Sequence, residues 1–187
     1  MLSLQIVMSN FTEELVKLHQ LTGAEFSRQV ERIALRKEFH PLETDEDIYS
    51  VGGEKSDDYP NLLTAARKAV EFGIKVYMLP NPIETRTPDF IFEKKGVYRA
   101  YDLKTVFGKA SVRSSLIDSI GQCNRVLLNM QVDYSTRSLA IAIRQYFEVN
   151  KKAIEVLVFK GGRHFSITRI IAMRSDYLVL FKKAYER

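Results

Sequence analysis

The stretch that decides the fold is residues 87–106, TPDFIFEKKGVYRAYDLKTV. Two runs rich in aromatic and aliphatic residues, 89–93 and 97–106, lie on either side of residues 94–96, Lys-Lys-Gly. Two such runs joined by a short connection that contains glycine are typical of a β-hairpin. The sequence therefore predicts two antiparallel strands at the centre of the chain.

Three charged residues occupy defined positions on this hairpin: Asp89 begins the first strand, and Asp102 and Lys104 lie on the second. Side chains two residues apart on a strand point to the same face, so Asp102 and Lys104 are expected to share a face. The hairpin also lets Asp89 approach Asp102. Buried charges without partners are costly, so these groups are solvated, pair with each other, or hold a cation. Two carboxylates are hard oxygen ligands that suit Mg²⁺ or Mn²⁺.

Outward from the hairpin, helical and strand-like patterns alternate, which predicts a mixed α/β fold with a central mixed sheet flanked by helices. We expect an N-terminal helical segment over residues 1–41 and one domain over residues 42–187. Residues 42–60 are polar and are expected to form an ordered loop, and residues 176–187 fit a strand or a helix. The expected helices are 10–38 (as one or two), 61–73, 111–123 and 135–150, and the further strands are 74–80, 125–130, 153–160 and 164–170.

Composition excludes several classes of protein. The chain has 187 residues, of which 45% are hydrophobic and 27% charged, values that argue against disorder, collagen and coiled-coil arrays. No apolar run approaches the length of a membrane helix. The opening residues lack the pattern of a secretory signal, so we expect action in the cytoplasm. The single cysteine, Cys123, excludes a disulfide framework or a cysteine-based zinc site within one chain.

The charge is distributed unevenly. The net charge is +5, but residues 104–187 contain 15 Lys and Arg against six Asp and Glu, a net charge of +9. Residues 1–103 therefore carry −4. A basic region favours polyanionic partners such as nucleic acid.

The charged residues of the hairpin carry a resemblance to a known superfamily. Pro88-Asp89 followed by Asp102-Leu103-Lys104 is similar to the PD-(D/E)xK motif of the restriction-endonuclease-like nucleases. The wider context, roughly residues 54–170, resembles the C-terminal nuclease domains of contact-dependent growth-inhibition toxins of bacteria. The resemblance implies a restriction-endonuclease-like core and metal-dependent hydrolysis of phosphodiester bonds in RNA, with tRNA among the substrates, or in DNA. For a toxin domain it also implies an immunity protein as partner.

The resemblance assigns roles to the hairpin residues. Asp89 and Asp102 match the two acidic metal ligands of the motif, and Lys104 matches its lysine, which would orient the attacking water. Gln122 matches a glutamine that such relatives carry after the motif, where it could hydrogen-bond the site water or the substrate.

One expected ligand of the superfamily has no counterpart here. Relatives usually carry a Glu on the helix before the first strand, but the helix at 61–73 has Leu62 near that place. Glu54, Asp57 or Asp58, just upstream, are the candidate replacements. Glu54 is favoured because the preceding two glycines let the backbone approach closely.

The missing helix Glu keeps a second hypothesis open, a catalytically inactive nuclease-fold module that binds nucleic acid or a protein. Plainer interpretations of single residues also stay open. Asp102 and Lys104 fit a charged, solvated strand edge, and Asp89 after a proline fits a turn. Asp57 and Asp58 fit the N-terminal cap of a helix.

Overall fold

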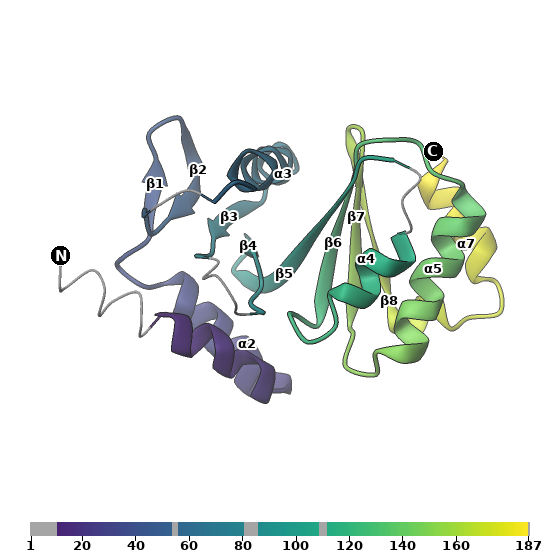
Figure 1. Cartoon of the computed structure of the whole chain (residues 1–187), viewed down its shortest axis with the longest axis horizontal. Coiled ribbons are helices and arrows are strands. Elements are labelled where there is room, and N and C mark those ends of the chain that lie inside the picture. Colours follow the sequence, from purple (N-terminus) through teal and green to yellow (C-terminus); the bar gives the residue numbers. More distant parts are fainter. Residues whose placement is uncertain (1–10, 54–55, 81–85, 109–111, 187) are drawn as a thin grey trace. The chain divides into compact units, whose positions relative to one another are not determined.

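The structure is a computed structural model that describes residues 11–53, 56–80, 86–108 and 112–186. Eight strands are hydrogen-bonded in chain order, from β1 to β8, and helices flank them (Figure 1). This confirms the predicted mixed α/β fold. The chain divides into two compact units, residues 1–101 and 102–187, which we describe separately. The expected domain boundary after residue 41 stays a prediction.

The first unit begins with helical residues 11–17 and ends within the strand β5. The hairpin predicted at its end is confirmed, with β4 and β5 antiparallel and Phe90 opposite Tyr101. The two residues of its turn, Lys95 and Gly96, have φ angles of 54° and 76°. The elements of this unit are η1 (Leu18–Gln20), α2 (Gly23–Ala34), β1 (His40–Leu42), β2 (Asp45–Ser50), α3 (Tyr59–Glu71), β3 (Lys75–Met78), β4 (Phe90–Lys94) and β5 (Val97–Val106).

The loop expected at residues 42–60 is wrong in its first part, where the structure has two strands. β1 and β2 pair with each other antiparallel, and β2 pairs with β3 in parallel. Within Asp45–Ser50, DEDIYS, only Ile48 is buried. The run therefore lacks the apolar alternation that marks a strand in sequence, because long-range pairing with β3 decides its conformation.

The second unit holds the rest of β5 and a helix-covered sheet. Residues 102–106 of β5 pair in parallel with β6, β6 pairs in parallel with β7, and β7 pairs antiparallel with β8. Residues 126–130 are all buried, so both faces of this strand are covered. The elements that follow β5 are α4 (Val112–Asp118), β6 (Arg125–Met130), α5 (Thr136–Val149), β7 (Glu155–Lys160), β8 (Arg163–Thr168), α6 (Arg169–Ala172) and α7 (Tyr177–Tyr185).

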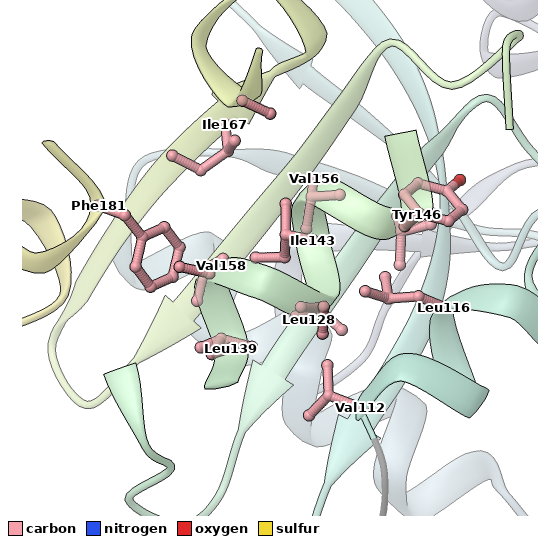
Figure 2. Packing of buried hydrophobic residues seen from close by; sticks show 14 of the residues in the cluster. Val112, Leu116, Leu128, Leu139, Ile143, Tyr146, Val156, Val158, Ile167 and Phe181 are labelled. Atoms are coloured by element: carbon pink, nitrogen blue, oxygen red, sulfur yellow. The ribbon is translucent and has the colours of Figure 1, made fainter. Parts of the chain in front are cut away.

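One apolar core holds the second unit together. Helices α4, α5 and α7 lie on the same side of its strands in Figure 1, and their buried side chains meet those of the strands. Figure 2 shows Ile143 of α5 among Leu128, Val156 and Val158 of the sheet. Burial of this many aliphatic and aromatic side chains is the main favourable term for folding of the unit.

One predicted strand ends earlier than expected, and one segment that the sequence left open as strand or helix is a helix. The strand expected at 164–170 ends at Thr168, whose hydroxyl accepts a hydrogen bond from the Ile171 N–H and caps the short helix α6. The segment that fitted a strand or a helix is the helix α7, whose Tyr177, Phe181 and Tyr185 are buried at a spacing of four residues. Helical spacing of the apolar residues therefore decides this segment.

Candidate functional site

The second half of β5 carries a buried ion pair, formed by Asp102 and Lys104. The Asp102 side chain is 1% exposed, and that of Lys104 is 20% exposed. The Lys104 ammonium nitrogen lies 3.1 Å from Oδ1 of Asp102 and 3.0 Å from Oδ2. The two residues thus share a face of the strand, as their spacing predicted, and one ammonium group covers both carboxylate oxygens.

This ion pair lies at the border of the apolar core. Asp102 is the first residue of β5 that pairs with β6, opposite Val126. Because side chains alternate along a strand, Asp102 and Lys104 point to the same side as Val106, which belongs to the helix-covered core. A carboxylate in such a place needs a cation close by, since removing a charge from water costs several kcal/mol. The interpretation as a solvated strand edge does not fit the burial of Asp102.

Two further ionisable side chains of the second unit lie within electrostatic reach of Asp102. Burial raises the pKa of the Cys123 thiol to about 12, and the negative charge of Asp102 adds to that rise. Burial also raises the pKa of Tyr146, with smaller contributions from Cys123 and Asp102 in the same direction. Both groups are therefore neutral at pH 7.

The hydroxyl of Tyr146 is part of a buried hydrogen-bond network. Asn150 Nδ2 donates to the Tyr146 hydroxyl at 3.1 Å, and Ser119 is a second hydrogen-bond partner of that hydroxyl. Ser119 Oγ in turn donates to the carbonyl of Leu116 at 2.6 Å. The network joins α5 to the segment after α4. Sequence analysis missed these residues, because a tyrosine or a serine within an apolar helical stripe gives no signal of its role.

Asp89 belongs to the first unit, where the sheet fixes its backbone. Its N–H donates to the carbonyl of Tyr101 at 2.9 Å, and its carbonyl accepts from the N–H of Leu79 at 2.9 Å. The side chain is half-buried. Asp89 therefore extends the ladder between β4 and its neighbours by one residue. Its proposed role as a metal ligand stays a prediction.

The candidate replacements for the missing helix Glu have different outcomes. Glu54 lies outside the described residues. Asp57 and Asp58 are exposed and precede α3, as the interpretation as a helix cap expected. Asp58 occupies the N-cap position without a side-chain bond to a helix N–H, and its Oδ1 accepts from Asn61 Nδ2 at 3.1 Å. Leu62 is buried, and the first turn of α3 holds no acid.

Gln122 lies in the turn after α4. Its Nε2 donates to the carbonyl of Asp118 at 2.9 Å, so the amide satisfies a carbonyl at the end of the helix. Contact of this side chain with a water or a substrate stays a prediction.

The described residues contain neither a cluster of metal ligands nor a membrane-spanning helix. No three His, Cys, Asp or Glu side chains in this part of the chain come together as ligands of a metal ion. Among the helices of residues 11–53, 56–80, 86–108 and 112–186, none has the length and apolar character to cross a membrane.

Comparison with known proteins gives one structural likeness. No family model and no curated protein matches the sequence. Among solved structures, the chain is similar to a "CdiA-CT/CdiI toxin and immunity complex from Burkholderia pseudomallei", at 16% sequence identity and a TM-score of 0.42. The match covers 63% of this chain and 92% of the other. A likeness at this level establishes neither a family nor an activity.

Proposed function

We propose that the chain is a metal-dependent nuclease that hydrolyses phosphodiester bonds in RNA or DNA. The observation that carries the proposal is the buried pair of Asp102 and Lys104, whose contacts are 3.0 and 3.1 Å. A charged pair at the border of an apolar core contributes little to stability relative to apolar side chains, so its presence in this place favours a chemical role. The spacing Asp-x-Lys on one strand is that of the PD-(D/E)xK motif.

The residues present fit a divalent cation by their donor chemistry. Mg²⁺ is usually held by one or two carboxylates, with waters and substrate phosphate completing its shell, so a cluster of three protein ligands is not required. In the proposal Asp102 and Asp89 hold the ion. Asp89 is included because it matches the first acidic residue of the sequence motif. Glu54 or Asp58 would complete the shell.

The chemistry of the proposed site follows from its charges. When bound, Mg²⁺ or Mn²⁺ would polarise the phosphodiester and lower the pKa of a water. The Lys104 ammonium would donate to the attacking water and offset negative charge that develops on the phosphoryl oxygens. Gln122 would contribute a hydrogen bond to water or substrate after leaving the Asp118 carbonyl. The attacking water forms the new P–O bond and gives its proton to solvent, while the bond to the leaving oxygen breaks and that oxygen takes a proton from solvent.

The charge of the second unit supports a nucleic-acid substrate. Residues 102–187 contain 15 basic and seven acidic residues, a net charge of +8. Such a unit attracts phosphate backbones through sequence-independent electrostatics. The choice of tRNA, a role as a bacterial toxin domain and an immunity protein as partner are expectations from the sequence resemblance.

The second candidate is a non-catalytic module that binds nucleic acid or a protein. Two observations favour it: the first turn of α3 carries no acid, and Lys104 covers both oxygens of Asp102. In this case the pair of charges would be a remnant that serves only the fold.

Cleavage of pooled tRNA and of plasmid DNA with Mg²⁺, Mn²⁺ or EDTA separates the two candidates. We expect metal-dependent cleavage that falls by roughly 10²- to 10³-fold or more in Asp102→Asn, Asp89→Asn and Lys104→Ala. Asp133→Asn is the matched control, since Asp133 also pairs with a lysine but is 92% exposed. Tight binding of nucleic acid without cleavage by the folded wild type would establish the non-catalytic module instead.

A further inference from the structure

We infer that Lys104 is a built-in counter-ion that must leave the oxygens of Asp102 when a divalent cation binds, so that metal binding and release of the Lys104 ammonium are one event. The inference rests on the proposed function, because it concerns the same site. It adds a regulatory property: without metal, the lysine that would serve the reaction is held on the carboxylate.

The geometry of the ion pair supports this competition. The ammonium nitrogen of Lys104 lies at nearly equal distances from the two oxygens of Asp102, 3.1 and 3.0 Å. A divalent cation at this site would be held by the same carboxylate oxygens that the ammonium now contacts. Two cations so close together repel each other strongly in a poorly hydrated place. The ammonium therefore has to move away before the metal can sit on the carboxylate.

Burial explains why the fold needs a counter-ion when metal is absent. Asp102 is 1% exposed, so water hydrates its charge poorly. Its ionisable neighbours Cys123 and Tyr146 are a thiol and a phenol, which cannot carry a positive charge. Lys104 supplies it from the same strand.

The asymmetry of exposure explains why the lysine, and not the aspartate, is the mobile partner. Asp102 is closed in, whereas 20% of the Lys104 side chain is in contact with solvent. A lysine has a flexible four-carbon stem, which lets its ammonium move while the backbone of β5 stays in the sheet. The released ammonium is then available to a water or a phosphate oxygen.

The experiment measures Mn²⁺ affinity by calorimetry and the accessibility of Lys104 by amine labelling with mass spectrometry. We expect Lys104→Met to bind Mn²⁺ at least about tenfold more tightly than the wild type. In the wild type, saturating Mg²⁺ should raise the labelling rate of Lys104 severalfold. The labelling uses the unaltered protein, so it tests the inference even where Lys104→Met does not fold.

Lys160→Met is the matched control variant. Lys160 has the same side-chain exposure, 20%, and pairs at 3.2 Å with Asp133, which is 92% exposed. This change removes the same charge from the same unit, so it should leave the Mn²⁺ affinity unchanged.

Each outcome decides one claim. If the wild type binds Mn²⁺ but labelling of Lys104 is the same with and without metal, the inference is overturned and the proposed nuclease stands. Equal gains in affinity for Lys104→Met and Lys160→Met would also overturn it, because they would indicate general charge repulsion. If neither the wild type nor Lys104→Met binds Mn²⁺, the proposed function itself fails.

Discussion

The two units each contain an aspartate paired with a basic side chain, and the two pairs have similar geometry but different surroundings. In the first unit, Asp45 of β2 receives two hydrogen bonds from Arg67 of α3, at 3.0 and 2.8 Å. In the second unit, Lys104 contacts Asp102 at 3.1 and 3.0 Å. The two aspartates, Asp45 and Asp102, are 18% and 1% exposed, and their basic partners are 51% and 20% exposed.

The comparison teaches that burial, not distance, decides what an ion pair does. In an exposed pair, each charge replaces contacts with water by a contact with its partner at nearly equal free energy. Such a pair therefore contributes little to the stability of the fold. A buried pair is held together because removal of either partner leaves the other charge buried and unpaired. Asp45 with Arg67 joins a strand to a helix, while Asp102 with Lys104 lies in a place where water is scarce.

The largest effect on stability is expected where the buried pair is broken. Lys104→Met leaves the Asp102 carboxylate without its ammonium partner and should lower the free energy of unfolding by about 3 kcal/mol. Urea denaturation followed by circular dichroism measures the change. Arg67→Met, which breaks the exposed pair, should have a much smaller effect.

A double variant sharpens that contrast. Asp102→Leu combined with Lys104→Met replaces both charges by apolar groups and should recover most of the lost stability. If the double variant were as unstable as Lys104→Met alone, the buried charge would not be the cause of the loss.

A smaller effect is expected from the buried hydroxyl of Tyr146. Tyr146→Phe leaves Asn150 Nδ2 without the acceptor that lies at 3.1 Å and should cost about 2 kcal/mol. The half-buried Tyr49 of the first unit provides the matched control, Tyr49→Phe, which should cost less in the same denaturation series. Equal losses would show that burial of the hydroxyl does not distinguish the two tyrosines.

The N-terminal caps of α5 and α3 differ in their side-chain hydrogen bonds. Ser135 Oγ accepts a hydrogen bond from the Ser138 N–H at the start of α5, whereas Asp58 makes no such bond at the start of α3. Ser135→Ala should therefore lower the unfolding free energy by about 1 kcal/mol. Asp58→Ala should change thermal stability less, and the reverse order in a melting experiment would contradict this assignment.

The smallest effect is a pH dependence confined to the exposed pair. The hydrogen bonds from Arg67 hold the pKa of Asp45 below its ordinary value of 3.8. Because the folded pKa is the lower one, this contribution to stability is present above the unfolded pKa and is lost as the pH falls through the folded pKa. Stability measured from about pH 6 down to about pH 2 should fall slightly more steeply in the wild type than in Asp45→Asn. Identical slopes would show that the pair of Asp45 and Arg67 does not contribute to the pH dependence of stability.

The sequence by itself determined the elements whose pattern is local. The hairpin at residues 87–106 follows from apolar runs around a Lys-Gly turn, and Gly73, with φ of 68°, ends α3 where its pattern stops. The shared face of Asp102 and Lys104 follows from the two-residue period of a strand. These features depend on neighbours in sequence, so the sequence contains their cause.

Only the tertiary structure decided the features that depend on distant residues. Asp45–Ser50 is a strand because β1 and β3 pair with it, although its own residues are mostly acidic or exposed. The fold also brings Cys123 and Tyr146, from other parts of the chain, within electrostatic reach of the Asp102 carboxylate. Strand pairing and burial are long-range properties, and the pattern of any one segment does not contain them.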